Sequence, residues 1–242
     1  MVNYLILVIL HLLADFYLQT DKIARCKNAI SDYRCIDCKE CGENSYLNFK
    51  YVVIHSALYA ILFVLPFFVA NHTDVIKSFF LIFVSHVIID SITCYINKKS
   101  KKTLVFIIDQ FIHLMILFCL YKIIDFNPVD EKYFFVVKTI FIMLLLMAPC
   151  SVFIDKMFED LYPGTISKGI FDVGSIIGIM ERFLVLIFSY YKSFPSIAMI
   201  ITVKTWARTN DLKKYNFRNR YLLGTLTSLA LALLCYVLFM II

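Results

Sequence analysis

The chain has 242 residues, of which 61% are apolar and only 17% are charged, and its mean hydropathy is +0.78. Soluble globular domains carry more charge and less apolar surface, so this composition excludes a water-soluble globule. The content of 23 Phe and 15 Tyr against six Gly and five Pro also excludes a disordered chain. We expect an all-α, polytopic helical membrane protein that forms a single membrane domain over residues 1–242.

Seven or eight apolar segments are predicted to cross the membrane as helices of one bundle, because each approaches the length of about 20 residues that a span needs. The seven longer segments are 2–18, 51–70, 79–96, 104–124, 133–154, 173–191 and 221–242. The shorter segment 194–207 begins after Ser193 and contains Pro195. It is either an eighth span or a re-entrant piece.

The distribution of basic residues predicts the orientation, because loops rich in Lys and Arg stay in the cytoplasm. One set of alternating loops carries 17 Lys and Arg residues and the other set carries three, provided that 194–207 crosses. We therefore expect a multi-pass protein of the cell inner membrane, with the loop 20–50 in the cytoplasm and both termini outside. Topology explains most of the net charge of +6, so no nucleic-acid partner is expected.

Seven ionisable residues lie inside the first four predicted spans, where each is expensive to bury. Six of them form His–Asp pairs four residues apart, so the two members of each pair share a helix face. Counted along the helix rise, all seven lie in one layer of the cytoplasmic half. The seven residues are His11, Asp15, His55, His86, Asp90, Asp109 and His113.

Imidazole and carboxylate groups at one depth are typical of a metal site. The number of ligands suits one or two ions, with zinc favoured by the imidazoles and manganese or iron as alternatives. The other interpretation is that each pair is a hydrogen-bonded link between helices.

Glu181 and Arg182 are predicted in the same layer of a later span, and Lys204 and Arg208 at the cytoplasmic end of the short span. One interpretation is an internal charge pair between Glu181 and Arg182, with Lys204 as an interfacial anchor. The other is a cationic lip that binds an anionic substrate beside the metal.

A cysteine cluster stands in the predicted cytoplasmic loop between the first and second spans, at Cys26, Cys35, Cys38 and Cys41. Disulfides are rare in that compartment, so four clustered thiols favour a structural zinc site. An iron–sulfur cluster and unliganded thiols are the alternatives.

Several of these stretches resemble a bacterial and phage membrane-protein family called domain of unknown function 3307. They are HLLADFYLQTDK from His11, His55, 86–90, 109–113, 178–182, 204–208 and 221–228. The resemblance brings no established activity, and the cysteine cluster is not associated with the family. The layout is also similar to membrane-bound metal-dependent hydrolases and, more distantly, to helical zinc phospholipases C.

The first functional hypothesis is a membrane-embedded, metal-dependent hydrolase that acts on a phosphoester or lipid headgroup from the cytoplasmic leaflet. Asp15 or Asp109 would act as general base, and Glu181, Arg182 and Lys204 would complete the catalytic site. The alternatives are a transporter of protons, ions or metal that uses the same groups, and a non-catalytic phage or defence protein with a structural metal.

Overall fold

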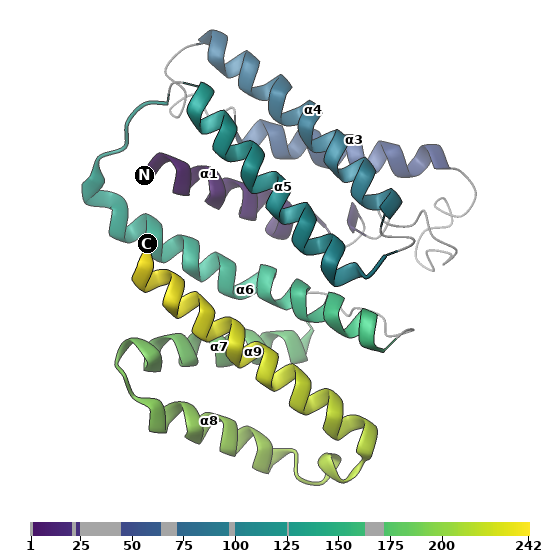
Figure 1. Cartoon of the computed structure of the whole chain (residues 1–242), viewed down its shortest axis with the longest axis vertical. Helices are drawn as coiled ribbons and strands as arrows, with labels where there is room; N and C mark the ends of the chain where they lie inside the picture. The colour runs from purple at the N-terminus through teal and green to yellow at the C-terminus, as the bar shows by residue number, and fades with distance from the viewer. Residues whose placement is uncertain are drawn as a thin grey trace. The chain divides into compact units, whose positions relative to one another are not determined.

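The computed structural model describes residues 2–20, 23–24, 45–63, 72–96, 100–124, 126–162 and 172–242 (Figure 1). These residues form eight α-helices and no strand, which confirms the all-α prediction. The chain divides into two compact units, Met1–Val137 and Lys138–Ile242.

The first unit is built from four apolar helices. The helix α1 (Val2–Leu12) continues directly into a π-helical turn over Leu13–Tyr17. It is followed by α3 (Ser45–Leu62), α4 (His72–Ile96) and α5 (Lys102–Ile123). The helix α4 packs against both α3 and α5, and α1 packs against α5. This arrangement brings helices from the whole unit around one interior.

The second unit contains α6 (Phe134–Leu161), whose first turn belongs to the first unit, and α7 (Val173–Tyr190). A short turn leads into α8 (Phe194–Ala207), and a 3-10 turn precedes α9 (Tyr215–Ile241). The helix α7 packs against both α8 and α9.

By length and composition, five helices could each cross a membrane: Asp74–Ile96, Lys102–Ile123, Glu131–Leu161, Val173–Tyr190 and Phe217–Ile241. Three shorter apolar helices are Val2–Tyr17, Phe49–Leu62 and Phe194–Ala207. Helices are expected for such segments because lipid offers no partner to the backbone polar groups. The 14 residues of α8 extend about 21 Å, which is less than the hydrocarbon thickness of about 30 Å.

Four helices extend six or seven residues beyond the predicted apolar segments, since α3 begins at Ser45 rather than at 51 and α9 at Tyr215 rather than at 221. The helix α4 begins at His72 rather than at 79, and α6 ends at Leu161 rather than at 154. The added turns contain charged residues such as Asp74, whose carboxylate lies 3.5 Å from Lys77 Nζ. Charged residues lower the local hydropathy without ending a helix, so an apolar run underestimates the helix length.

The helix α4 presents an apolar face to the outside and a polar face to the interior. Its exposed apolar side chains at intervals of four are Phe80, Val84, Ile88 and Ile92. By contrast, His86 and Asp90 are 1% and 2% exposed. This is the distribution expected of a helix surrounded by lipid, whose ionisable groups turn toward its own bundle.

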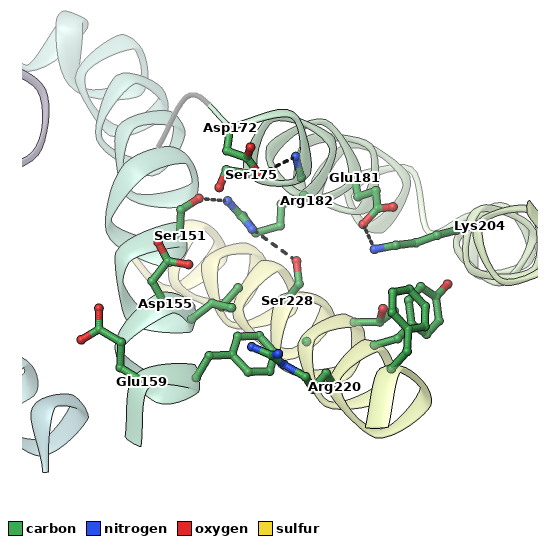
Figure 2. Close-up of a pocket in the computed structure, with 18 residues that line it drawn as sticks. Ser151, Asp155, Glu159, Asp172, Ser175, Glu181, Arg182, Lys204, Arg220 and Ser228 are labelled. Atoms are coloured by element: carbon green, nitrogen blue, oxygen red, sulfur yellow. Dashed lines mark hydrogen bonds and ion pairs between the residues drawn. The ribbon is translucent and has the colours of Figure 1, made fainter. Parts of the chain in front are cut away.

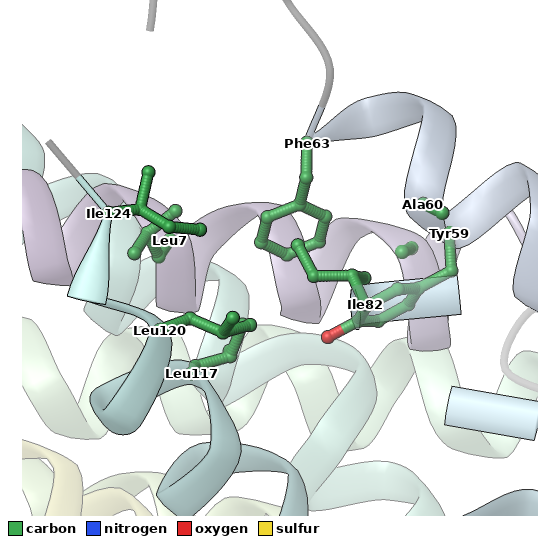
Figure 3. Close-up of a cluster of buried hydrophobic side chains, with 9 residues drawn as sticks. Leu7, Tyr59, Ala60, Phe63, Ile82, Leu117, Leu120 and Ile124 are labelled. Carbon is green, nitrogen blue, oxygen red and sulfur yellow. The ribbon is translucent and has the colours of Figure 1, made fainter. Parts of the chain in front are cut away.

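A cluster of nine buried side chains forms the apolar core of the first unit (Figure 3). Its members are Leu7, Ala14, Tyr59, Ala60, Phe63, Ile82, Leu117, Leu120 and Ile124. They come from α1, the π-helical turn, α3, α4 and α5, and the cluster ends in the loop after α5. Tyr59 also contacts the histidines of this unit, so the apolar core adjoins the polar site directly.

Candidate metal centre in the first unit

The first unit brings the seven predicted ligands together from four helices. His11 lies at the end of α1, Asp15 in the π-helical turn and His55 on α3, while α4 and α5 each carry one His–Asp pair. All four histidines are 1–3% exposed. The π-helical turn closes with a hydrogen bond of 2.9 Å from the Leu18 amide to the Leu13 carbonyl. Such turns are frequent at functional sites because they shift the direction of a side chain.

Two carboxylates and two imidazoles from the π-helical turn, α3 and α4 face one another within the cluster. Asp15 Oδ1 lies 3.3 Å from His55 Nε2 and 3.5 Å from His86 Nε2. Asp90 Oδ2 lies 3.6 Å from His86 Nε2 and 3.9 Å from His55 Nε2. Ligand atoms on a tetrahedral zinc ion stand about 3.3–3.6 Å apart. Three of the four distances therefore lie within the range of a zinc coordination shell. The fourth, 3.9 Å between Asp90 and His55, is longer.

Four of the ligand atoms are buried and make no hydrogen bond within the described part of the chain. They are Asp15 Oδ1 and the Nε2 atoms of His55, His86 and His113. A buried polar atom without a partner costs free energy, and buried polar groups in folded proteins are usually paired. A cation held by Asp15, His55 and His86 would supply the missing partner in that group, and one held by His86, Asp90 and His113 would do so for His113.

His113 is held in the tautomer that a metal ligand needs. Its Nδ1 donates a hydrogen bond of 2.9 Å to the backbone carbonyl of Asp109. A neutral imidazole protonated at Nδ1 keeps a lone pair at Nε2. His113 joins His86 and Asp90 in one triad whose ligand atoms lie within 4.8 Å of one another, and His86 also joins Asp15 and His55 in a second such triad.

His11 and Asp109 belong to neither triad among the described residues, and hydrogen bonds engage both. Gln110 Nε2 donates to Asp109 Oδ2 at 3.1 Å and to Asp15 Oδ2 at 3.5 Å, which turns its amide oxygen toward His11. His11 Nε2 then donates to that oxygen at 3.1 Å, and His11 Nδ1 accepts from the Tyr59 hydroxyl at 2.9 Å. We assign His11 and Asp109 to a surrounding layer that orients the ligands.

Sequence reasoning missed three members of this surrounding layer, Tyr59, Gln110 and Thr93. The Tyr59 ring stacks on His86 with centroids 3.9 Å apart, and Thr93 donates a hydrogen bond of 2.7 Å to Asp109 Oδ1. A signal was present for Tyr59, which follows His55 by four residues and so shares its helix face. Gln110 had no such signal, because an uncharged amide beside Asp109 does not stand out in a sequence.

The donor set fits a divalent cation. It combines imidazole nitrogen with carboxylate oxygen, which suits zinc, manganese and iron. Gln110 donates a hydrogen bond to the ligand Asp15, and the ligand His113 donates one to the Asp109 carbonyl; such outer contacts are usual for ligand groups in metal sites.

The other predicted catalytic residues lie in the second unit. Arg182 is 2% exposed, and its guanidinium donates to the carbonyls of Leu146 and Met147 and to the hydroxyls of Ser151 and Ser228. Glu181 and Lys204 form an ion pair with a distance of 2.5 Å. Glu181 therefore pairs with Lys204, whereas one interpretation of the sequence was an internal charge pair between Glu181 and Arg182. The predicted zinc ligands Cys26, Cys35, Cys38 and Cys41 lie outside the described residues.

The chain matches the model of one protein family over residues 4–142, described as protein of unknown function (DUF3307). This range contains all seven predicted ligands, while the later stretches 178–182, 204–208 and 221–228 lie beyond it. No curated protein and no solved structure matches the chain. Because the family model covers more than half of the chain, the protein belongs to the DUF3307 family.

Proposed function

We propose that this protein is a membrane-embedded, metal-dependent hydrolase whose reaction centre is the His/Asp cluster of the first unit. The observation that carries the proposal is the set of buried ligand atoms that lack a hydrogen-bond partner in the described residues: Asp15 Oδ1 and Nε2 of His55, His86 and His113. Asp90 Oδ2 stands beside two of them. We assign one or two zinc ions to these five residues, with manganese or iron as the alternatives.

The chain's own residues would divide the work between binding and proton transfer. A bound divalent cation supplies Lewis acidity and makes a nearby water a stronger nucleophile at neutral pH. Asp15 would hold the ion through Oδ1 and accept the proton of the attacking water at Oδ2, which Gln110 keeps in place. Asp109 would act as a positioning residue, because Thr93 and Gln110 occupy its two oxygens and its carbonyl fixes His113.

The substrate class we propose is a phosphoester carried by a membrane lipid or a phosphorylated headgroup. A site among apolar helices is reached most directly by an amphiphile. Arg182 and Lys204 were predicted to hold the phosphate of this substrate beside the metal. That role stays a prediction, because both residues contact residues of the second unit, whereas the metal ligands lie in the first.

The proposed topology has eight spans in the cell inner membrane, both termini outside, and the cysteine loop in the cytoplasm. It rests on the uneven distribution of basic residues between alternating loops. With this orientation the His/Asp cluster lies in the cytoplasmic half of the membrane. The topology is tested with a membrane-impermeant maleimide, applied to intact and to permeabilised cells. We expect the loop cysteines Cys26, Cys35, Cys38 and Cys41 to be labelled only after permeabilisation, and labelling in intact cells would contradict the orientation.

The first experiment measures the metal content of purified protein by inductively coupled plasma mass spectrometry. All variants carry serine at the four loop cysteines, which removes any metal held there. We expect one or two equivalents in this background and a loss of bound metal in His86→Ala. The matched control is Leu117→Ala, which empties a similarly buried position of the same unit without removing a ligand atom. Equal metal in His86→Ala and Leu117→Ala would contradict the site.

The second experiment separates hydrolysis from transport. Metal-loaded protein is assayed with a chromogenic phosphodiester, and proteoliposomes are assayed for flux of a divalent ion. We expect hydrolysis by the wild type and by folded Leu117→Ala, and none by Asp15→Asn. Ion flux without hydrolysis would contradict the hydrolase and establish the transporter.

A further inference from the structure

The second unit contains an open pocket of about 530 Å³, lined by side chains of α6, α7, α8 and α9 (Figure 2). This volume is within the range of about 300–1,000 Å³ that is usual for small-molecule sites. Two glycines contribute to the volume of the cavity, because they have no side chain. A Cβ atom at Gly224 would approach the Phe158 ring to 3.1 Å, and one at Gly178 would approach Arg182 Nη1 to 3.3 Å. Both glycines line the cavity, so larger residues there would narrow it.

An acidic stripe of the cavity lies on α6, and Asp172 and Glu181 add two carboxylates from the start of α7 and from α7 itself. Ser151, Asp155 and Glu159 stand four residues apart on α6 and all line the cavity, so they form a polar stripe along one helix face. Figure 2 shows Asp155 and Glu159 together on this helix. The Ser151 hydroxyl is hydrogen-bonded to Arg182 and Met147, and the Glu159 carboxylate pairs with Lys156 Nζ at 3.3 Å. Because a carboxylate accepts several hydrogen bonds, Asp155 and Glu159 can also accept from an ammonium group.

The cationic side chains of the cavity come from the other three helices. Arg182 on α7 is anchored to α6 and α9 by the hydrogen bonds described above. Lys204 on α8 is held by Glu181, and Figure 2 shows it on the side of the cavity away from Asp155. Arg220 on α9 lies over the Tyr162 ring, with its guanidinium carbon 4.8 Å from the centroid. Lys204 and Arg220 are therefore ordered donors for an anion such as phosphate.

Carbon-rich surface completes the lining between the charged groups. Ile154 and Phe158 come from α6, and Phe217 and Tyr221 from α9. A ligand that fits this lining has a positive end, a negative end and some apolar carbon. A simple anion would be repelled by the carboxylates, and a simple cation by the basic residues.

We propose that this cavity binds a zwitterionic headgroup with a primary ammonium and a phosphate, of the phosphoethanolamine type. The ammonium donates to Asp155 and Glu159, and the phosphate accepts from Lys204 and Arg220. The headgroup has two sources with the same chemistry, phosphatidylethanolamine from the membrane and free phosphoethanolamine. This site belongs to the second unit alone and does not rest on the metal centre.

The test is calorimetric titration of the purified full chain in detergent with four probes. They are dihexanoyl phosphatidylethanolamine, free phosphoethanolamine, dihexanoyl phosphatidylcholine and dihexanoyl phosphatidylglycerol. We expect binding of the first, and binding at least about tenfold weaker for the choline lipid, whose ammonium has no N–H to donate. The glycerol lipid, which has no ammonium, should also bind at least about tenfold more weakly. Binding of free phosphoethanolamine as well would identify the headgroup as the whole ligand, and its absence would identify the membrane lipid.

Paired variants locate the binding in this cavity. Asp155→Asn and Arg220→Gln should each weaken binding of the ethanolamine lipid about tenfold or more. Asp160 and Arg218 lie on the same two helices but do not line the cavity. Asp160→Asn and Arg218→Gln should therefore leave binding of the ethanolamine lipid unchanged. The proposal fails if the wild type does not bind the ethanolamine lipid, if the glycerol lipid binds equally well, or if the two members of each pair behave alike.

Discussion

Replacement of Arg182 by Met is the most direct test of what holds the second unit together. The Arg182 guanidinium reaches the carbonyls of Leu146 and Met147 on α6, within one turn before Pro149. Proline removes a backbone donor and disturbs the hydrogen bonds of the preceding turn. Prolines in membrane helices are tolerated where neighbouring groups stabilise the disturbed turn, and Arg182 on α7 donates to the two carbonyls that follow Leu145, whose own helical donor Pro149 removes. Methionine keeps the length of the side chain but none of its donors.

The magnitude follows from the four hydrogen bonds that the side chain donates. Their lengths are 2.8 Å to Leu146 O, 3.1 Å to Met147 O, 2.6 Å to Ser151 Oγ and 3.3 Å to Ser228 Oγ. Hydrogen bonds between membrane helices average about 0.6 kcal/mol each, so their loss removes about 2–3 kcal/mol. For a chain of this size we expect the melting temperature to fall by about 5–10 °C.

The assay is thermal unfolding in detergent, followed by circular dichroism. The control is Arg208→Met, because Arg208 is half-exposed and makes an ion pair of 3.5 Å with Asp211. Such surface pairs contribute about 0–1 kcal/mol, so the control should lower the melting temperature by less than about 3 °C. Equal shifts in the two variants would refute the role assigned to Arg182.

Three further predictions concern the first unit. Gln110→Leu removes the amide that connects three members of the site, and we expect metal affinity to fall about 10–100-fold in competition with a fluorescent chelator. Tyr59→Phe removes the hydroxyl that binds His11 but keeps the aromatic ring, so we expect a loss of about 1 kcal/mol in chemical denaturation. Asn3→Ala removes two hydrogen bonds to the segment after α5, of 2.8 and 3.1 Å, so the Val129 amide should exchange faster with deuterium.

Two of these predictions are compared with a control variant, Leu117→Ala in the first unit and Thr139→Ala in the second. Leu117→Ala should lower stability without changing the metal affinity of the folded fraction, so an equal loss of affinity there would contradict the role of Gln110. Thr139→Ala, outside the cluster, is the reference for Tyr59→Phe. Equal destabilisation by the two variants would contradict the stabilising role of the Tyr59 hydroxyl. Unchanged exchange at Val129 in Asn3→Ala would show that these two hydrogen bonds do not protect the segment.

The apolar runs predicted the helices, because lipid leaves the backbone no alternative to internal hydrogen bonding. The ends of α4 and α6 could not be predicted in the same way, since charged turns such as the one containing Asp74 continue a helix after hydropathy has fallen. The seven candidate ligands were also visible in the sequence, because ionisable groups are rare in apolar segments.

The division of those seven into ligands and supporting groups could not be predicted. His11 and His86 look equivalent in sequence, since each stands four residues before an Asp. In the structure both nitrogens of His11 are engaged by Tyr59 and Gln110, while His86 Nε2 faces the two carboxylates. The difference arises from partners on other helices, which spacing within one helix does not contain.

The π-helical turn at Leu13–Tyr17 makes the first helix sensitive to the insertion or deletion of a residue, which its composition does not reveal. Such a turn is equivalent to one extra residue in an α-helix, and one residue corresponds to a rotation of about 100°. A deletion of one residue within the turn would hardly change the hydropathy or the length of the helix. It would nevertheless rotate Asp15 and the residues beyond it relative to His11. Insertions and deletions in this helix are therefore expected to be far more damaging than substitutions of one apolar residue by another.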